Sequence, residues 1–129
     1  MSDLVTRFED CTLPPAEFHH ADHVRVVWEY LRAEPLLVDA LHRFATNLRR
    51  FATHHGKPRL YHETITWAYL ALIHERMLHD PQADWRTFAE TNSDLLTWKP
   101  SVLDRYYTPE RLFSDAARRS FVLPDRVEG

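Results

Sequence analysis

The sequence predicts an all-α protein, a single-domain helical bundle over residues 1–129 with three long helices followed by several short C-terminal helices. Apolar residues recur at spacings of three and four along most of the chain, as they do on one face of a helix. Prolines and capping residues separate these periodic stretches. Glycine is scarce, since only Gly56 and Gly129 occur, so the glycine-containing turns typical of β-hairpins are missing.

Composition excludes several classes of function. Hydrophobic residues make up 44% of the 129 residues and charged residues 27%, as in globular proteins. The net charge of −3 and the lack of a basic stripe predict no nucleic-acid partner. No stretch has the roughly 20 apolar residues of a membrane-spanning helix. The N-terminus does not resemble a signal peptide, so we expect no membrane association and a cytoplasmic location.

The scarcity of glycine and cysteine narrows the chemistry further. A P-loop and a dinucleotide-binding fingerprint both need glycines that this chain lacks. Cys11 is the one cysteine, which excludes an internal disulfide and a cysteine-based zinc site.

Three long helices are predicted from the prolines and the glycine that mark helix boundaries along the chain. The first follows Pro14 and Pro15 and runs to about Ala33. The second begins near Pro35 and ends at Gly56, which suits a left-handed terminal position. Its apolar face consists of Leu37, Leu41, Phe44, Leu48 and Phe51. The third covers residues 61–79 and stops before Asp80 and Pro81.

The C-terminal half predicts shorter elements. Helical segments are expected within residues 83–92 and 93–98, and a turn or short helix after Pro100. Thr108 and Ser114 each precede helix-forming residues and are expected to act as N-caps.

Histidines are concentrated where the first long helix begins, in the stretch EFHHADH of residues 17–23. At 100° of rotation per residue, His20 falls among the apolar residues of this helix and His23 at their flank. His19 lies nearer the boundary with the polar face. His20 and His23 are therefore predicted to point inward, as neighbours at positions i and i+3.

The third long helix carries a similar residue. His62 falls on the buried stripe defined by Ile65, Tyr69, Leu72 and Ile73. Glu63 lies to the side of that stripe. If the two helices pack with these ends together, then His20, His23 and His62 converge on one point.

Three converging imidazoles predict a metal site. Such a ligand set suits zinc, and also copper, nickel or iron, and it leaves a position open for water or substrate. The sequence thus predicts a metal-dependent enzyme acting on a small molecule, with His20, His23 and His62 as ligands. Glu63 is the candidate acid–base or ligand-orienting group.

Other interpretations stay open. The histidines can instead be hydrogen-bonded core residues of a non-catalytic helical module that binds a small ligand or a partner protein. Haem ligation is a third alternative, although no haem attachment motif occurs. If the helix begins one residue away from the expected position, His19 and His23 form the inward pair.

Three segments also resemble a family of small bacterial all-helical proteins. They are FHHADHVRVVWEYL, YHETITWAYL and RYYTPERLFSDAARRSFVLPD. The resemblance implies that a shared pattern of the family includes Phe18, His20, His23, His62 and the closing Leu-Pro-Asp of residues 123–125. It implies no activity. The chain is also loosely similar to DinB-like bundles, which hold a metal with three histidines. In those proteins the single histidine precedes the spaced pair, whereas here the pair comes first.

Overall fold

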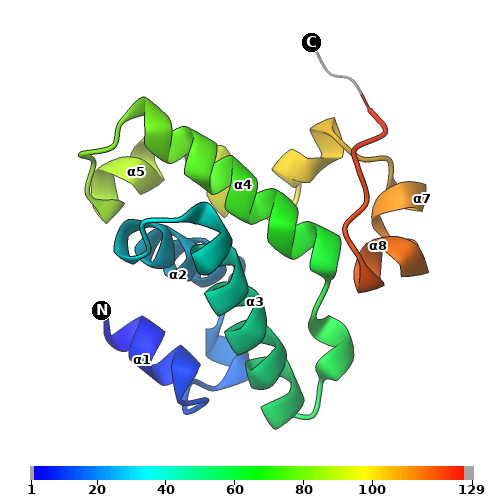
Figure 1. The fold of residues 1–129 in the computed structure, drawn as a ribbon, viewed down its shortest axis with the longest axis horizontal. Coiled ribbons are helices and arrows are strands. Elements are labelled where there is room, and N and C mark those ends of the chain that lie inside the picture. The colour runs from blue at the N-terminus through cyan, green and yellow to red at the C-terminus, as the bar shows by residue number, and fades with distance from the viewer. Residues whose placement is uncertain (1, 127–129) are drawn as a thin grey trace.

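The fold is all-α, as predicted. The structure is a computed structural model that describes residues 2–126, and every regular element within this range is helical (Figure 1). The α-helices are α1 (Asp3–Glu9), α2 (His20–Ala33), α3 (Leu37–His54), α4 (Glu63–His79), α5 (Trp85–Thr91), α6 (Ser93–Leu96), α7 (Pro109–Leu112) and α8 (Asp115–Arg119). Three 3-10 helices connect them, namely η1 (Pro15–Glu17), η2 (Pro58–Leu60) and η3 (Val102–Arg105).

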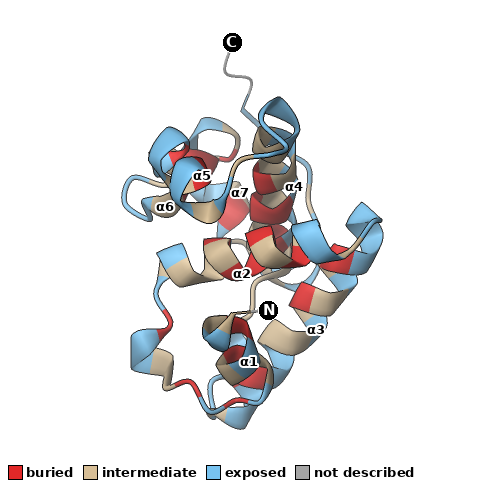
Figure 2. Ribbon diagram, turned by 90° about the vertical axis from the view of Figure 1, so that its left-hand side faces the viewer, coloured by how far each residue is buried: buried red, intermediate tan, exposed pale blue. Residues whose placement is uncertain are grey.

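Helices α2, α3 and α4 pack against one another and enclose the core. Helix α1 lies against α2 and α3, while α8 packs on α4. Buried residues gather on the faces that these helices turn toward each other (Figure 2). None of the described helices is long and apolar enough to cross a membrane.

Helix α1 was not predicted from the sequence. Ser2 caps it by accepting a hydrogen bond from the backbone N–H of Val5, and Asp3 in the first turn suits the positive end of the helix dipole. Val5 and Phe8, one turn apart, are both fully buried. Phe8 packs on Phe18 with the ring centroids 4.9 Å apart. This short helix therefore closes one side of the core.

Helix α2 begins later than the two prolines suggested. Residues 15–17 form only η1, and Phe18 and the extended His19 separate it from the helix, which starts at His20. The Asp22 carboxylate accepts a hydrogen bond from the His19 N–H at 3.0 Å, which fixes this start. The first predicted helix is thus two elements, and only the second of them is long enough to line the core.

The ends of α3 and α4 agree closely with the sequence. Helix α3 ends at His54, and Gly56 follows with a φ of 72°, the left-handed conformation that favours glycine. Helix α4 begins at Glu63, so His62 is its N-cap and not a residue of its first turn. The difference of one residue changes the role of His62.

The C-terminal segment is fastened across the start of α4. The Thr64 hydroxyl donates to the Ser120 carbonyl at 2.8 Å and accepts from the Val122 N–H at 3.1 Å. The Asp125 carboxylate accepts hydrogen bonds from the N–H and hydroxyl of Thr108. These bonds hold residues 120–125 beside α4 and α7 although they form no helix.

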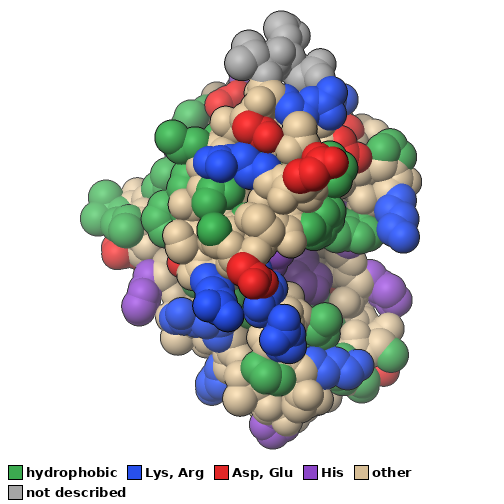
Figure 3. All heavy atoms as spheres, turned by 90° about the vertical axis from the view of Figure 1, so that its right-hand side faces the viewer, with side chains coloured by type: hydrophobic (Ala, Val, Ile, Leu, Met, Phe, Trp, Pro, Cys, Tyr) green, Lys and Arg blue, Asp and Glu red, His purple; other side chains and the backbone are tan. Residues whose placement is uncertain are grey.

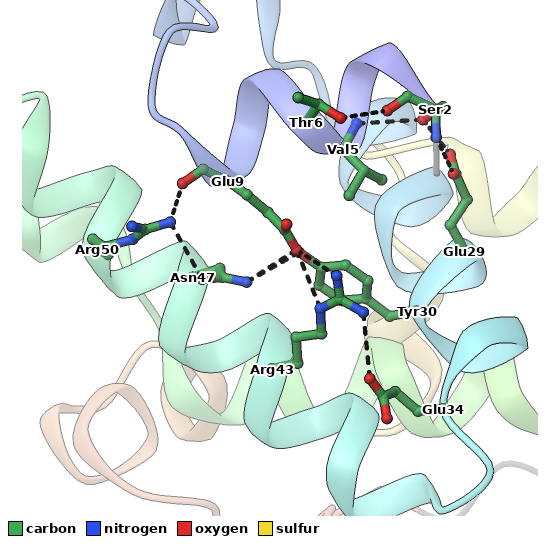
Figure 4. Close-up of polar contacts among 10 residues, drawn as sticks. All are labelled: Ser2, Val5, Thr6, Glu9, Glu29, Tyr30, Glu34, Arg43, Asn47 and Arg50. Atoms are coloured by element: carbon green, nitrogen blue, oxygen red, sulfur yellow. Dashed lines mark hydrogen bonds and ion pairs between the residues drawn. The ribbon is translucent and has the colours of Figure 1, made fainter.

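A polar network joins α1, α2 and α3 (Figure 4). The hydroxyl of the fully buried Tyr30 donates to the Glu9 carboxylate and accepts from the Asn47 amide. Arg43 pairs with Glu9 at 2.9 Å and with Glu34 at 3.3 Å, and its guanidinium lies over the Tyr30 ring. Because the carboxylate is surrounded by donors, its partial burial is compensated.

Replacing Tyr30 by phenylalanine tests this network. The substitution keeps the ring and removes the donor to Glu9 and the acceptor for Asn47. We expect a loss of about 1–2 kcal/mol in the free energy of unfolding, measured by urea denaturation. Tyr106→Phe is the control, since the Tyr106 hydroxyl makes no hydrogen bond to a described residue. Equal stability of the two variants would show that the network contributes nothing.

Candidate functional site: an apolar cavity with three histidines

A cavity of about 410 Å³ lies between α2, α3 and α4 and opens beside η2. Protein interiors rarely contain voids much larger than a water molecule, whereas ligand pockets have about 300–1,000 Å³. The walls are mainly apolar and consist of Val24, Val27, Phe44, Leu48, Ile65 and Ile73. The polar groups are the three predicted histidines together with Arg59, Thr66 and Tyr69.

His62 uses both ring nitrogens to hold the protein together. Nδ1 accepts a hydrogen bond from the Ile65 N–H at 3.1 Å and so caps α4. Nε2 lies 2.8 Å from the Leu112 carbonyl oxygen, so it must carry the proton and donate it. Burial lowers the pKa of His62, while its backbone hydrogen bonds act in the opposite direction. This imidazole is neutral and has no nitrogen left for a ligand.

His20 is tied to another part of the chain. Its Nε2 lies 2.9 Å from the Leu95 carbonyl oxygen at the end of α6 and donates to it. The ring packs edge-to-face on Tyr69, and Trp98 lies on another side with ring centroids 5.1 Å apart. Burial lowers the pKa of His20, so Nδ1 is an acceptor in the neutral ring.

His23 has the most perturbed titration of the three. Its ring stacks on Phe18 with centroids 3.9 Å apart and planes at 15°. The imidazole is half-buried in the cavity wall, and desolvation lowers the pKa of His23 to about 3, with a smaller contribution from His20. Neither ring nitrogen makes a hydrogen bond to a described residue. A neutral donor and a neutral acceptor are thus present in the cavity wall.

The predicted metal centre is wrong, and with it the metal-dependent enzyme. Within residues 2–126 no group of three or more His, Cys, Asp or Glu side chains is placed to hold a metal ion. The reason lies in the hydrogen bonds. One ring nitrogen of His62 accepts from the N–H of Ile65 and the other donates to the Leu112 carbonyl, while Nε2 of His20 donates to the Leu95 carbonyl. The three histidines do line one cavity, as expected, but they are hydrogen-bonded wall residues.

His19 and Glu63 lie outside the cavity. The His19 side chain is 74% exposed and pairs with Asp22 at 3.5 Å, so the inward residue of the adjacent pair is His20. Glu63 accepts a hydrogen bond from the Tyr61 hydroxyl, and the presence of that carboxylate adds to burial in raising the pKa of Tyr61. The carboxylate does not belong to the described cavity wall, and a catalytic role for Glu63 stays an untested prediction.

Sequence reasoning missed the residues that shape the entrance. Arg59 and Leu60 come from η2, and Trp98 follows α6. All three are exposed in part, with Leu60 70% and Trp98 40% accessible. No local pattern could have identified them, because the packing of distant segments brings them to one opening.

No family model, curated protein or solved structure matches this chain significantly.

Proposed function

We propose that this protein binds a small, mainly apolar organic molecule in the cavity between α2, α3 and α4. The observation that carries the proposal is the cavity's size together with its lining: about 410 Å³ of space with apolar walls and a few polar groups. This combination is typical of small-molecule sites, in which apolar area supplies affinity and a few polar groups fix orientation. Binding needs no catalysis, and the neutral imidazoles supply hydrogen bonds without the desolvation cost of a charge.

The hydrogen bonds described above favour a preformed site. His62 and His20 are each held by a backbone carbonyl from another helix, and the Tyr69 hydroxyl lies 2.8 Å from the Ser101 hydroxyl. Side chains fixed in this way lose little conformational entropy when a ligand binds. The cavity is accordingly a rigid site at the junction of three helices.

Filling the cavity tests the proposal. The probe is 3-phenylpropanamide, a neutral aromatic amide that we expect to bind in about the millimolar range or more tightly. Ile65 lines the cavity, and Ile65→Trp should weaken binding at least about tenfold by occupying the space. Affinity is measured by chemical-shift titration in two-dimensional NMR.

Leu78→Trp is the matched control, because Leu78 lies on the same helix, is 65% exposed and is not a cavity residue. It should bind the probe as the parent does. Leu48→Trp, from α3, serves as a second filling variant if Ile65→Trp unfolds. Undiminished binding in a folded filling variant, or no binding by the parent, would refute the proposed function.

A further inference from the structure

One positively charged side chain lies at the entrance of the cavity. Arg59 is the sole charged side chain among the described residues that line it. Its guanidinium is exposed and makes no ion pair or hydrogen bond with a described residue. Other arginines of this protein do form ion pairs, as Arg43 does with Glu9 and Arg76 with Asp94. Arg59 is thus free to bind an anionic group from outside the chain.

Basic and acidic side chains both lie on the surface of this side of the molecule. On the face shown in Figure 3, Lys and Arg side chains gather around a recess in which histidine surface is visible, although acidic surface also borders it. That face is the side of Figure 1 on which η2 connects α3 to α4. A cluster of basic groups raises the local concentration of anions.

The inner cavity cannot stabilise a cation. No carboxylate belongs to its described wall, and the pKa values of His20, His23 and His62 are all lowered, so these rings are neutral at pH 7. A buried ammonium group would have no counter-charge there. An anion at the entrance, in contrast, would keep partial contact with water and pair with Arg59.

We infer that the ligand is an apolar organic acid, with its hydrocarbon body between Val27, Ile65 and Ile73 and its anionic group on Arg59. This inference rests on the proposed function and specifies its ligand class. A guanidinium can donate two parallel hydrogen bonds to a carboxylate, which gives orientation as well as affinity.

Two probes of equal shape test the inference. The acid 3-phenylpropanoate and its amide differ in charge but have almost the same size. We expect the parent protein to bind the acid roughly tenfold more tightly, as for a charge-assisted hydrogen bond at a partly wet site. Arg59→Gln should reduce this preference to about threefold or less, because it removes the positive charge that favours the acid over the amide.

Lys57→Gln is the matched control, since it removes one positive charge two residues away from the cavity residue and Lys57 is not a cavity residue. It should retain the preference for the acid. Equal affinity of the parent for both probes would overturn the inference and leave the proposed function intact. A preference that persists in Arg59→Gln would also overturn it. If the parent protein binds neither probe, the proposed function and the inference are both refuted.

Discussion

Replacing His62 by alanine is expected to lower the free energy of unfolding by about 2–3 kcal/mol. The variant loses the cap that accepts the Ile65 N–H and the donor that reaches the Leu112 carbonyl. The second bond joins the start of α4 to the end of α7, so its loss should also loosen the C-terminal segment. Urea denaturation measures the stability, and a chelator added to the parent protein should leave the unfolding curve unchanged.

His62→Asn separates the two contributions. Asparagine is a good N-cap but is too short to make the second bond to Leu112, so about half of the loss should be recovered. His79→Ala, on an exposed residue at the other end of α4, should change stability by less than about 0.5 kcal/mol. A His62→Ala variant as stable as His79→Ala would contradict the assigned role of His62. A chelator that destabilises the parent protein but not His62→Ala would also contradict it.

Acidification from pH 7 to pH 5 is expected to lower the stability by about 2 kcal/mol through His23 alone. The folded pKa of His23 is about 3, against an ordinary value of 6.5 for an unfolded chain. Below pH 6.5 the unfolded state therefore binds more protons than the folded state, and stability falls as the pH falls toward 3. The lowered pKa values of His20 and His62 act in the same direction.

His23→Gln removes this titration while keeping a polar side chain in the cavity wall. Its stability should fall by about 2 kcal/mol less than that of the parent between pH 7 and pH 5. The carboxylates of Asp94 and Asp125 do not contribute to the stability change between pH 7 and pH 5. Their pKa values are lowered below 3.8, so the stability they contribute is lost only below that pH. Parallel pH profiles for the parent and His23→Gln would contradict the burial of a neutral His23.

Much of the helical architecture could be predicted from the spacing of apolar residues and from the prolines, glycine and capping residues that mark helix ends. The apolar stripe of α3, with Leu41, Phe44, Leu48 and Phe51 facing the core, and the left-handed Gly56 both agree with the structure. Leu37, which was predicted to belong to the same stripe, is 43% exposed. Helix α1 was missed because seven residues give too short a pattern, although Ser2 followed by Asp3 is a common helix start.

The candidate site was predicted only in part. Helical rotation correctly placed His20 and His23 inward, and the packing of α2 on α4 brings them to the cavity that His62 lines. Rotation could not show which nitrogens were already bonded, because Leu95 and Leu112 lie 75 and 50 residues away in the sequence from their histidine partners. The Leu95 and Leu112 carbonyls that occupy the histidine nitrogens reach them only through tertiary packing.

Nuclear Overhauser contacts between bound 3-phenylpropanamide and the methyl groups of the protein test the central claim most directly. If the cavity is the binding site, the aromatic protons of the probe should show contacts to Val27, Ile65 and Ile73, which line it. The exposed side chains of Val38 and Leu78 should show none. Contacts confined to such surface residues, with none to the three cavity residues, would contradict the account.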